Sequence, residues 1–306
     1  MIAKTRYTRV AAAGILLLAV SLALAGQIHG VRQGSPGSEK SRPSRPGSTL
    51  AGESPNPNMP RPIHAYDTVF LEEMTWLEVR DALRAGKKTV IVATGGIEMN
   101  GPYLALGKHN VVLRATTQAI ARRLGDALVA PIVAFVPEGN IEPPSGHMRY
   151  PGTISLTERT FKALLTDIAL SLRAHGFEHV VLIGDSGGNQ AGMQQTASEL
   201  TAKWRDGRTR IHFIAEYHDY PGLSKYMQTL GVNEVDEGHH DDFAITSEMM
   251  VVDPQTVRYA ERVKAGKASI NGVSLAPIER TVELGKQAVA WRADKTVNAI
   301  RKARGY

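Results

Sequence analysis

Short apolar runs alternate along this chain with longer segments of helical periodicity, and this alternation limits the possible folds more than any other feature. The apolar runs are typical of buried strands and cover residues 89–93, 128–136, 179–183 and 211–215. Helical patterns lie between or after them at residues 111–124, 157–176, 190–204, 254–264 and 277–301. Because the runs and the helices alternate, the sequence predicts an α/β fold, a three-layer sandwich with a mainly parallel sheet.

The first 63 residues differ in composition from the rest of the chain. Lys4, Arg6 and Arg9 precede an apolar run over residues 10–25, which is the pattern of a secretory signal peptide. We expect a signal peptide at residues 1–25, a Pro/Ser/Gly-rich linker at 26–63 and the α/β domain at 64–306. The protein is then exported, periplasmic or secreted, without a stable membrane span after cleavage. An uncleaved anchor is the alternative, although the apolar run is short for a membrane span.

The formal net charge of +6 belongs to this N-terminal part. Residues 1–63 hold eight Lys/Arg and two Asp/Glu, so the remaining chain holds 28 of each sign. The body therefore lacks the basic surplus of a nucleic-acid-binding domain, and we expect no nucleic-acid partner. The chain has no cysteine, which excludes a zinc site built on thiolates.

A polar loop follows the first predicted strand. It runs from Thr94 to Asn110 and contains Glu98, Asn100 and His109. Open α/β sheets bind their ligands at the carboxyl ends of the strands, which is where this loop lies. The loop therefore predicts part of a binding or catalytic site. The alternative is a long surface loop whose polar residues are incidental.

A glycine-rich turn follows the third predicted strand and carries Asp185, Ser186 and Asn189. Its glycines allow the backbone to approach a ligand, and the next helix offers free N–H groups. Asp185 is expected at the same sheet edge as Glu98. The alternative role for Asp185 is to cap the following helix.

A third polar segment contains His239, His240 and Asp241 within residues 237–242. Imidazoles between carboxylates favour metal ligation or general-base chemistry. A solvated loop is the alternative. His147 lies in a loop rich in Pro and Gly, where a single histidine is usually a hydrogen-bonding surface group.

Four segments, in this order, resemble the creatininase (creatinine amidohydrolase) family. Residues 96–109, reading GIEMNGPYLALGKH, resemble the family loop GSxEQHGPHLPLxTD. Residues 147–155, HMRYPGTIS, resemble HxxFPGTIS, and residues 184–189, GDSGGN, resemble NGHGGN. Residues 240–247 resemble HAGxxETS. The resemblance covers about residues 69–254 and implies a creatininase-like α/β fold with metal-dependent amidohydrolase activity.

The differences from the family pattern lie at the positions that hold the metal ions in the family. The resemblance implies a two-metal centre that takes a Glu, a His and a bridging Asp from the first loop, and a further His from the third. Glu98 keeps its position, whereas Asn100 replaces the His, His109 replaces the Asp and Ser186 replaces the loop His. In the late segment Ile245 replaces a Glu.

We expect that the site has been rebuilt around one divalent ion, or two, with zinc or manganese suited to its ligands. The expected metal ligands are Glu98, His109, Asp185 and His240. Glu98 and His240 are the expected catalytic residues, with His240 carrying a proton to the leaving nitrogen. The expected substrate contacts are Asn100, His147, Ser186, Asn189, His239 and Asp241.

These expectations describe a hydrolase of carbon–nitrogen bonds other than peptide bonds, acting on a small linear or cyclic amide. The resemblance also implies a homo-oligomer, and specifically a hexamer. One alternative is a non-catalytic exported binding protein that kept the fold and lost the metal centre. Another is an envelope interaction protein in which the linker is the functional part.

Overall fold

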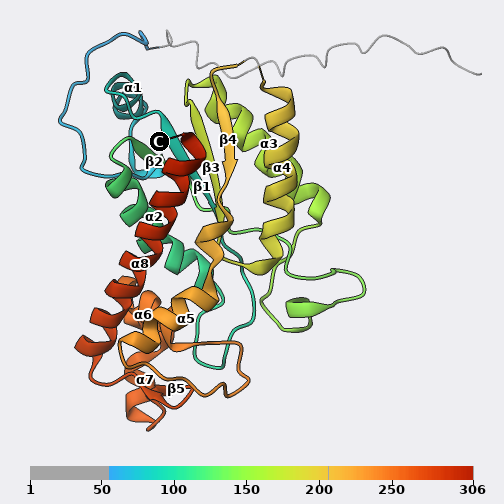
Figure 1. Cartoon of the computed structure of the whole chain (residues 1–306), viewed down its shortest axis with the longest axis vertical. Helices are drawn as coiled ribbons and strands as arrows, with labels where there is room; N and C mark the ends of the chain where they lie inside the picture. Colours follow the sequence, from blue (N-terminus) through green and yellow to red (C-terminus); the bar gives the residue numbers. More distant parts are fainter. Residues whose placement is uncertain (1–54, 206, 306) are drawn as a thin grey trace, which may run out of the picture. The chain divides into compact units, whose positions relative to one another are not determined.

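A central parallel sheet organises the described part of the chain. The structure, a computed structural model, describes residues 55–205 and 207–305, so the expected signal peptide and most of the linker lie outside it. The sheet has the strand order β2-β1-β3-β4 (Figure 1). Its strands are β1 (Thr89–Thr94), β2 (Ala127–Val129), β3 (His179–Gly184) and β4 (Arg210–Phe213). All neighbouring strands pair in parallel, as the sequence predicts.

Helices cover both faces of this sheet (Figure 1). One face packs against α3 (Glu158–Ala174) and α4 (Gln190–Lys203), the other against α2 (Lys108–Leu124) and α8 (Ile278–Arg304). Side chains of β1 alternate between the two cores: Val90 and Val92 face α3 and α4, whereas Ile91 faces α2 and α8. Because both faces are buried, the strands are apolar throughout, and the three-layer α/β prediction is confirmed.

Four further helices and a short antiparallel ribbon lie outside the central sheet and the helices that cover its faces. The helices are α1 (Trp76–Arg84), α5 (Tyr220–Thr229), α6 (Phe243–Val252) and α7 (Tyr259–Lys264), and the antiparallel ribbon is β5 (Ser269–Ile270) with β6 (Val273–Ser274). Short 3-10 turns occupy Leu71–Glu73, Gly146–Arg149, Gly187–Asn189, Ala215–His218 and Pro254–Val257. None of the helices within the described residues combines the length and apolar character needed to cross a membrane.

Local sequence signals explain several boundaries. The side chain of Thr75 accepts from the backbone N–H of Glu78, and the Glu78 carboxylate accepts from that of Thr75, which forms a capping box at the start of α1. The apolar run at 128–136 forms only the short strand β2, because Pro131 has no N–H for a ladder.

Two helices near the site differ from what the sequence indicates. Helix α2 begins at Lys108 rather than near Val111, so His109 lies in its first turn and not on the preceding loop. Residues 217–238, for which the sequence shows no helical pattern, contain α5, whose amino end is capped by the Asp219 carboxylate through the N–H of Gly222. Side-chain capping of this kind satisfies a free helical donor.

Candidate active site

The carboxyl ends of β1 and β3 bring two acidic side chains to one edge of the sheet. Thr94 pairs with Gly184 at the ends of these strands, and the N–H of Asp185 donates to the carbonyl of Thr94 at 3.0 Å. Glu98 and Asp185 both line a cavity of about 1400 Å³ at this edge. The cavity therefore lies where an open α/β sheet binds its ligand.

His109 connects the two acids. Its Nδ1 lies 2.7 Å from Oδ2 of Asp185, and its Nε2 lies 2.8 Å from Oε1 of Glu98. Burial alone would lower the pKa of His109, but the hydrogen bonds to Asp185 and Glu98 outweigh burial and raise it. Both nitrogens of the imidazole thus already have carboxylate partners.

Asp185 is fully buried, and an arginine from α8 neutralises its other oxygen. Nη2 of Arg292 contacts Oδ1 of Asp185, while Nη1 lies 2.9 Å from Oε2 of Glu248 in α6. Burial would raise the pKa of Asp185, but the charge of Arg292 and the bond from His109 hold it well below its usual range. A continuous line of paired charges therefore runs from the cavity into the interior.

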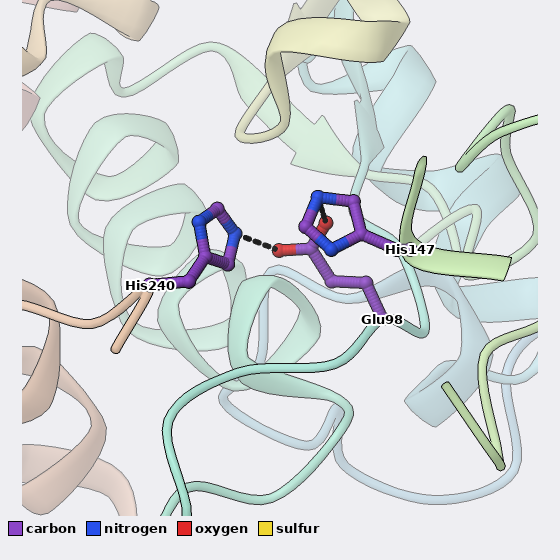
Figure 2. A group of neighbouring side chains, drawn as sticks. All are labelled: Glu98, His147 and His240. Atoms are coloured by element: carbon purple, nitrogen blue, oxygen red, sulfur yellow. Dashed lines mark hydrogen bonds and ion pairs between the residues drawn. The ribbon is translucent and has the colours of Figure 1, made fainter. Parts of the chain in front are cut away.

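Glu98 accepts from several donors at once. In addition to His109, its Oε1 lies 3.2 Å from Nε2 of His240 and 3.3 Å from Nζ of Lys108, while its Oε2 lies 3.4 Å from Nε2 of His147. Figure 2 shows the imidazoles of His147 and His240 directed at this carboxylate from separate segments. Burial would raise the pKa of Glu98, but the bonds from His109 and His240 hold it well below its usual range.

These groups fit a divalent cation. Glu98, His147 and His240 each offer one ligand atom, and the three atoms lie within 4.8 Å of one another. Two imidazoles and one carboxylate form a ligand set typical of catalytic zinc, which keeps a coordination position open for water or substrate. His147 belongs to this group although the sequence indicated a substrate contact. His109 and Asp185, expected as ligands, instead lie beside the group and are engaged with each other.

His240 adopts a backbone conformation that few residues other than glycine tolerate. Its φ is 54°, in the left-handed region, at a cost of about 1–3 kcal/mol for a strained residue. The next side chain, Asp241, packs against Gly101, where an added Cβ would lie 1.9 Å from its Oδ2. Gly101 in the first loop therefore allows the loop that carries His240 to approach Glu98 closely.

The other expected substrate contacts divide into two sets. Ser186 and Asp241 line the cavity, whereas Asn100, Asn189 and His239 do not. Asn189 is fully buried and its amide donates to the carbonyls of Thr94 and Gly95, so it fixes the end of β1. Asn100 similarly donates to the carbonyls of Glu98 and Ala105, and His239 is exposed outside the cavity.

Three buried charged residues of the site were missed by sequence reasoning. Lys108 is 6 % exposed and stands where the family loop has a threonine, a difference that could have revealed it. Glu138 is 5 % exposed, its Oε1 has no hydrogen-bond partner, and burial together with the Glu98 charge raises its pKa to about 9. Arg292 lies in α8, outside the four motifs, and no local pattern distinguishes it from a surface arginine.

Comparison with known proteins agrees with the geometry. The family described as creatininase, creatinine amidohydrolase, matches residues 72–300. The chain belongs to the creatininase family. A creatinine amidohydrolase of Pseudomonas putida is 28% identical over 116 residues, which cover 38% of this chain and 44% of that protein. A mycofactocin precursor peptide peptidase of Mycolicibacterium smegmatis is 27% identical over 122 residues, covering 38% of this chain and 47% of that protein.

Solved structures of the creatininase family share the fold. A structure named Creatininase Mn superposes with a TM-score of 0.58 at 21% identity and covers 78% of this chain and 100% of its own. A crystal structure of a creatinine amidohydrolase gives a TM-score of 0.55 at 22% identity, covering 78% and 98%. The matched regions span less than half of the two curated relatives, so their activities enter here only as proposals.

Proposed function

We propose that the protein hydrolyses the carbon–nitrogen bond of an amide in a small molecule, using one divalent cation held by Glu98, His147 and His240. The observation that carries this proposal is the convergence of these three side chains at the carboxyl edge of the sheet, in a member of the creatininase family. When bound, the ion supplies a Lewis acid and an activated water. Zinc and manganese suit a set of imidazole and carboxylate ligands.

Lys108 and His109 orient the Glu98 carboxylate. Both contact its Oε1, whereas His147 faces Oε2, so each oxygen has a separate environment. Hydrogen bonds that fix a ligating carboxylate commonly raise metal affinity. Lys108 also lines the cavity, where its ammonium group can stabilise negative charge that develops on a substrate carbonyl oxygen.

His240 is the most accessible of the three candidate ligands, with its side chain 47% exposed. It can therefore contact a substrate as well as Glu98. Asp185 and Arg292 keep the ring of His109 in place from behind.

Metal analysis of the purified protein, combined with hydrolysis assays, tests this proposal. We expect about one equivalent of zinc or manganese and release of amine or ammonia from some member of a panel of primary amides and lactams. His147→Ala should lose both metal and turnover, while His239→Ala, outside the cavity, should keep both. A folded protein that binds no divalent ion and hydrolyses no amide would instead support the binding-protein alternative. Cleavage of short peptides alone would overturn the substrate class.

We also propose export of the protein and assembly into a homo-oligomer, specifically a hexamer. Cell fractionation with sequencing of the mature amino terminus tests the first, and light scattering of the purified protein tests the second. Deletion of residues 27–63 separates the enzyme from the envelope interaction protein. An enzyme keeps its turnover after this deletion, whereas loss of function with an intact fold would point to the linker.

A further inference from the structure

The segment that carries His240, residues 231–242 between α5 and α6, has no regular secondary structure. His240 lies near its end, and its φ of 54° places it in the left-handed region. Such a conformation persists only where neighbouring structure holds it. Nε2 of His240 nevertheless lies 3.2 Å from Oε1 of Glu98. Support from outside the segment is therefore needed to keep this imidazole at the candidate metal site.

A two-residue turn of the β5–β6 ribbon contacts this segment. Ile270 pairs with Val273 in the ribbon, so Asn271 and Gly272 form the turn between the two strands. Both have a positive φ, 49° and 79°, as a type I′ turn requires. Asparagine followed by glycine is the preferred sequence for this turn, so the backbone explains the choice of residues. It does not explain the direction of the Asn271 side chain.

Both polar atoms of the Asn271 side chain bond to the segment between α5 and α6. Its Oδ1 accepts from the N–H of Glu237 at 3.0 Å, and its Nδ2 lies 3.1 Å from Oε1 of Glu234 and 3.1 Å from the carbonyl oxygen of Asp241. The backbone carbonyl of Asn271 also accepts from the N–H of Val235 at 2.9 Å. Since Asn271 is only 4 % exposed, these bonds are sheltered from water.

Asn271 also lines the cavity, but its amide has no hydrogen left for a substrate. An asparagine side chain donates two hydrogen bonds, and both are used, towards Glu234 and Asp241. These bonds therefore indicate a supporting role rather than a substrate contact. The bond to the carbonyl of Asp241 lies nearest to His240, because it fixes the residue that directly follows the strained one.

The ribbon is itself connected to the loop that follows β1. Arg262 of α7 is almost fully buried, and its Nε and Nη2 donate to the carbonyls of Lys267 and Ser269 at the base of the ribbon. The guanidinium carbon of Arg262 lies 4.4 Å from the centre of the Tyr103 ring in that loop. The ribbon is thus fixed relative to the loop that supplies Glu98, and its turn can hold a second ligand in place beside the first.

We propose that Asn271 is a positioning residue of the candidate metal site, which holds His240 against Glu98 through the backbone of Asp241. This inference rests on the proposed function, because it takes His240 as a metal ligand. Without the Asn271 amide, the segment loses three hydrogen bonds and the imidazole loses its defined place beside Glu98. Groups that orient a metal ligand typically contribute about 10–100-fold to metal affinity.

Asn271→Gly tests the proposal, because it removes the side chain while glycine accepts the positive φ of the turn. Zinc affinity is measured by calorimetry on the purified protein after bound metal has been removed. We expect the dissociation constant for zinc to rise about tenfold. Asn271→Asp tolerates the same turn but replaces the N–H donors, so it should weaken zinc binding as well.

Arg258→Gly is the matched control. It also replaces a non-glycine residue in the left-handed region, with a φ of 54°, but at an exposed position outside the cavity. The dissociation constant for zinc should stay unchanged in this variant. An unchanged constant in both Asn271 variants, or an equal rise in Arg258→Gly, overturns the proposal.

A second background shows whether Asn271 acts through His240. In His240→Ala the imidazole is absent, so Asn271→Gly should cause no further loss of zinc affinity. A residue that only stabilises the fold would lower the affinity by the same factor in both backgrounds, and that result overturns the proposal. If His240→Ala binds too little zinc to measure, chemical labelling of His240 decides.

Labelling of the metal-free protein also separates this inference from the proposed function. Diethyl pyrocarbonate modifies accessible imidazoles, and mass spectrometry compares the rate at His240 with that at the exposed His175 in the same sample. Asn271→Gly should raise the relative rate at His240 severalfold, because Nε2 is released from Glu98, while Arg258→Gly leaves it unchanged.

The two readouts fail independently. An unchanged labelling rate in Asn271→Gly overturns the role of Asn271 even if the protein binds metal and hydrolyses amides. Faster labelling in a protein that binds no metal would refute the proposed function and leave the support of His240 by Asn271 standing.

Discussion

Nδ1 of His109 lies 2.7 Å from Oδ2 of Asp185, and neither side chain has appreciable contact with water. This pair holds an imidazole in the first turn of α2 against a carboxylate at the end of β3. A buried ion pair stabilises a fold only when each charge is compensated. Arg292 on one side and Glu98 on the other provide that compensation.

Asp185→Asn should therefore destabilise the protein strongly. The substitution leaves the buried Arg292 cation facing a neutral amide, and the expected loss is about 3–5 kcal/mol of unfolding free energy at pH 7. Urea unfolding followed by circular dichroism measures it. The partly exposed pair of Asp219 and Lys295 is the control, since Asp219→Asn should cost about 0–1 kcal/mol. Similar losses in the two variants would contradict the buried network.

The stability difference between the native protein and Asp185→Asn should depend on pH in a defined direction. The pKa of Asp185 is depressed in the folded state. Its ionised carboxylate therefore contributes to the unfolding free energy above the unfolded pKa of about 3.9, and this contribution is lost as the pH falls towards the folded pKa. The difference should thus be constant between pH 5 and 6 and shrink below about pH 4. Unfolding free energies measured across this range provide the check, and a difference that grows on acidification would refute the assignment.

Lys108→Met should reduce turnover more than it reduces metal affinity, because His109 still orients the Glu98 carboxylate. The substitution removes the ammonium group next to Glu98, and loss of one electrostatic stabiliser of a developing oxyanion costs about 10²–10³-fold in kcat. Two effects on the unfolding free energy oppose each other: the buried pair with Glu98 is lost, but a cation that opposes the dipole of α2 is also removed.

Two companions make the Lys108 experiment interpretable. Lys108→Arg keeps the charge and should recover part of the activity, whereas Lys286→Met, on the exposed surface, should change nothing. The measurements are kcat, KM and metal equivalents for each variant. A loss of turnover in Lys108→Met that follows its loss of metal would show that Lys108 acts only through Glu98 and not on the substrate.

The sequence predicts the framework of this site because its signals are local. Apolar runs and caps define β1, β3 and α1, and the parallel topology then places Glu98 and Asp185 at one edge. The partners of these acids depend on tertiary packing. Arg292 reaches Asp185 from a helix more than 100 residues further along the chain, and nothing in its neighbourhood signals that it is buried.

The start of α2 shows how a small error in a boundary changes the chemistry. An expected start near Val111 leaves His109 as a free loop ligand, whereas the observed start at Lys108 turns its ring towards Asp185 and Glu98. Helix boundaries are uncertain from sequence because the flanking residues, Gly107 here, carry no side-chain cap. The expected metal ligands therefore include His109 and Asp185, whereas the group that converges in space contains His147 with Glu98 and His240.

Gly285→Ala should destabilise the fold and disturb the site from a distance. An added Cβ at Gly285 in α8 would lie 2.2 Å from the carbonyl oxygen of Ser247 in α6. Since that oxygen belongs to the backbone, the helices must separate, at about 1–3 kcal/mol for an overpacked core. Glu248 follows Ser247 in α6 and pairs with Arg292, which lies two turns further along α8. Separation of the two helices therefore also strains the ion pair between Arg292 and Asp185. Urea unfolding and metal affinity should both fall, while the neighbouring exposed change Lys286→Ala leaves them unaltered. An unchanged unfolding free energy for Gly285→Ala would show that α6 and α8 are free to move apart without cost.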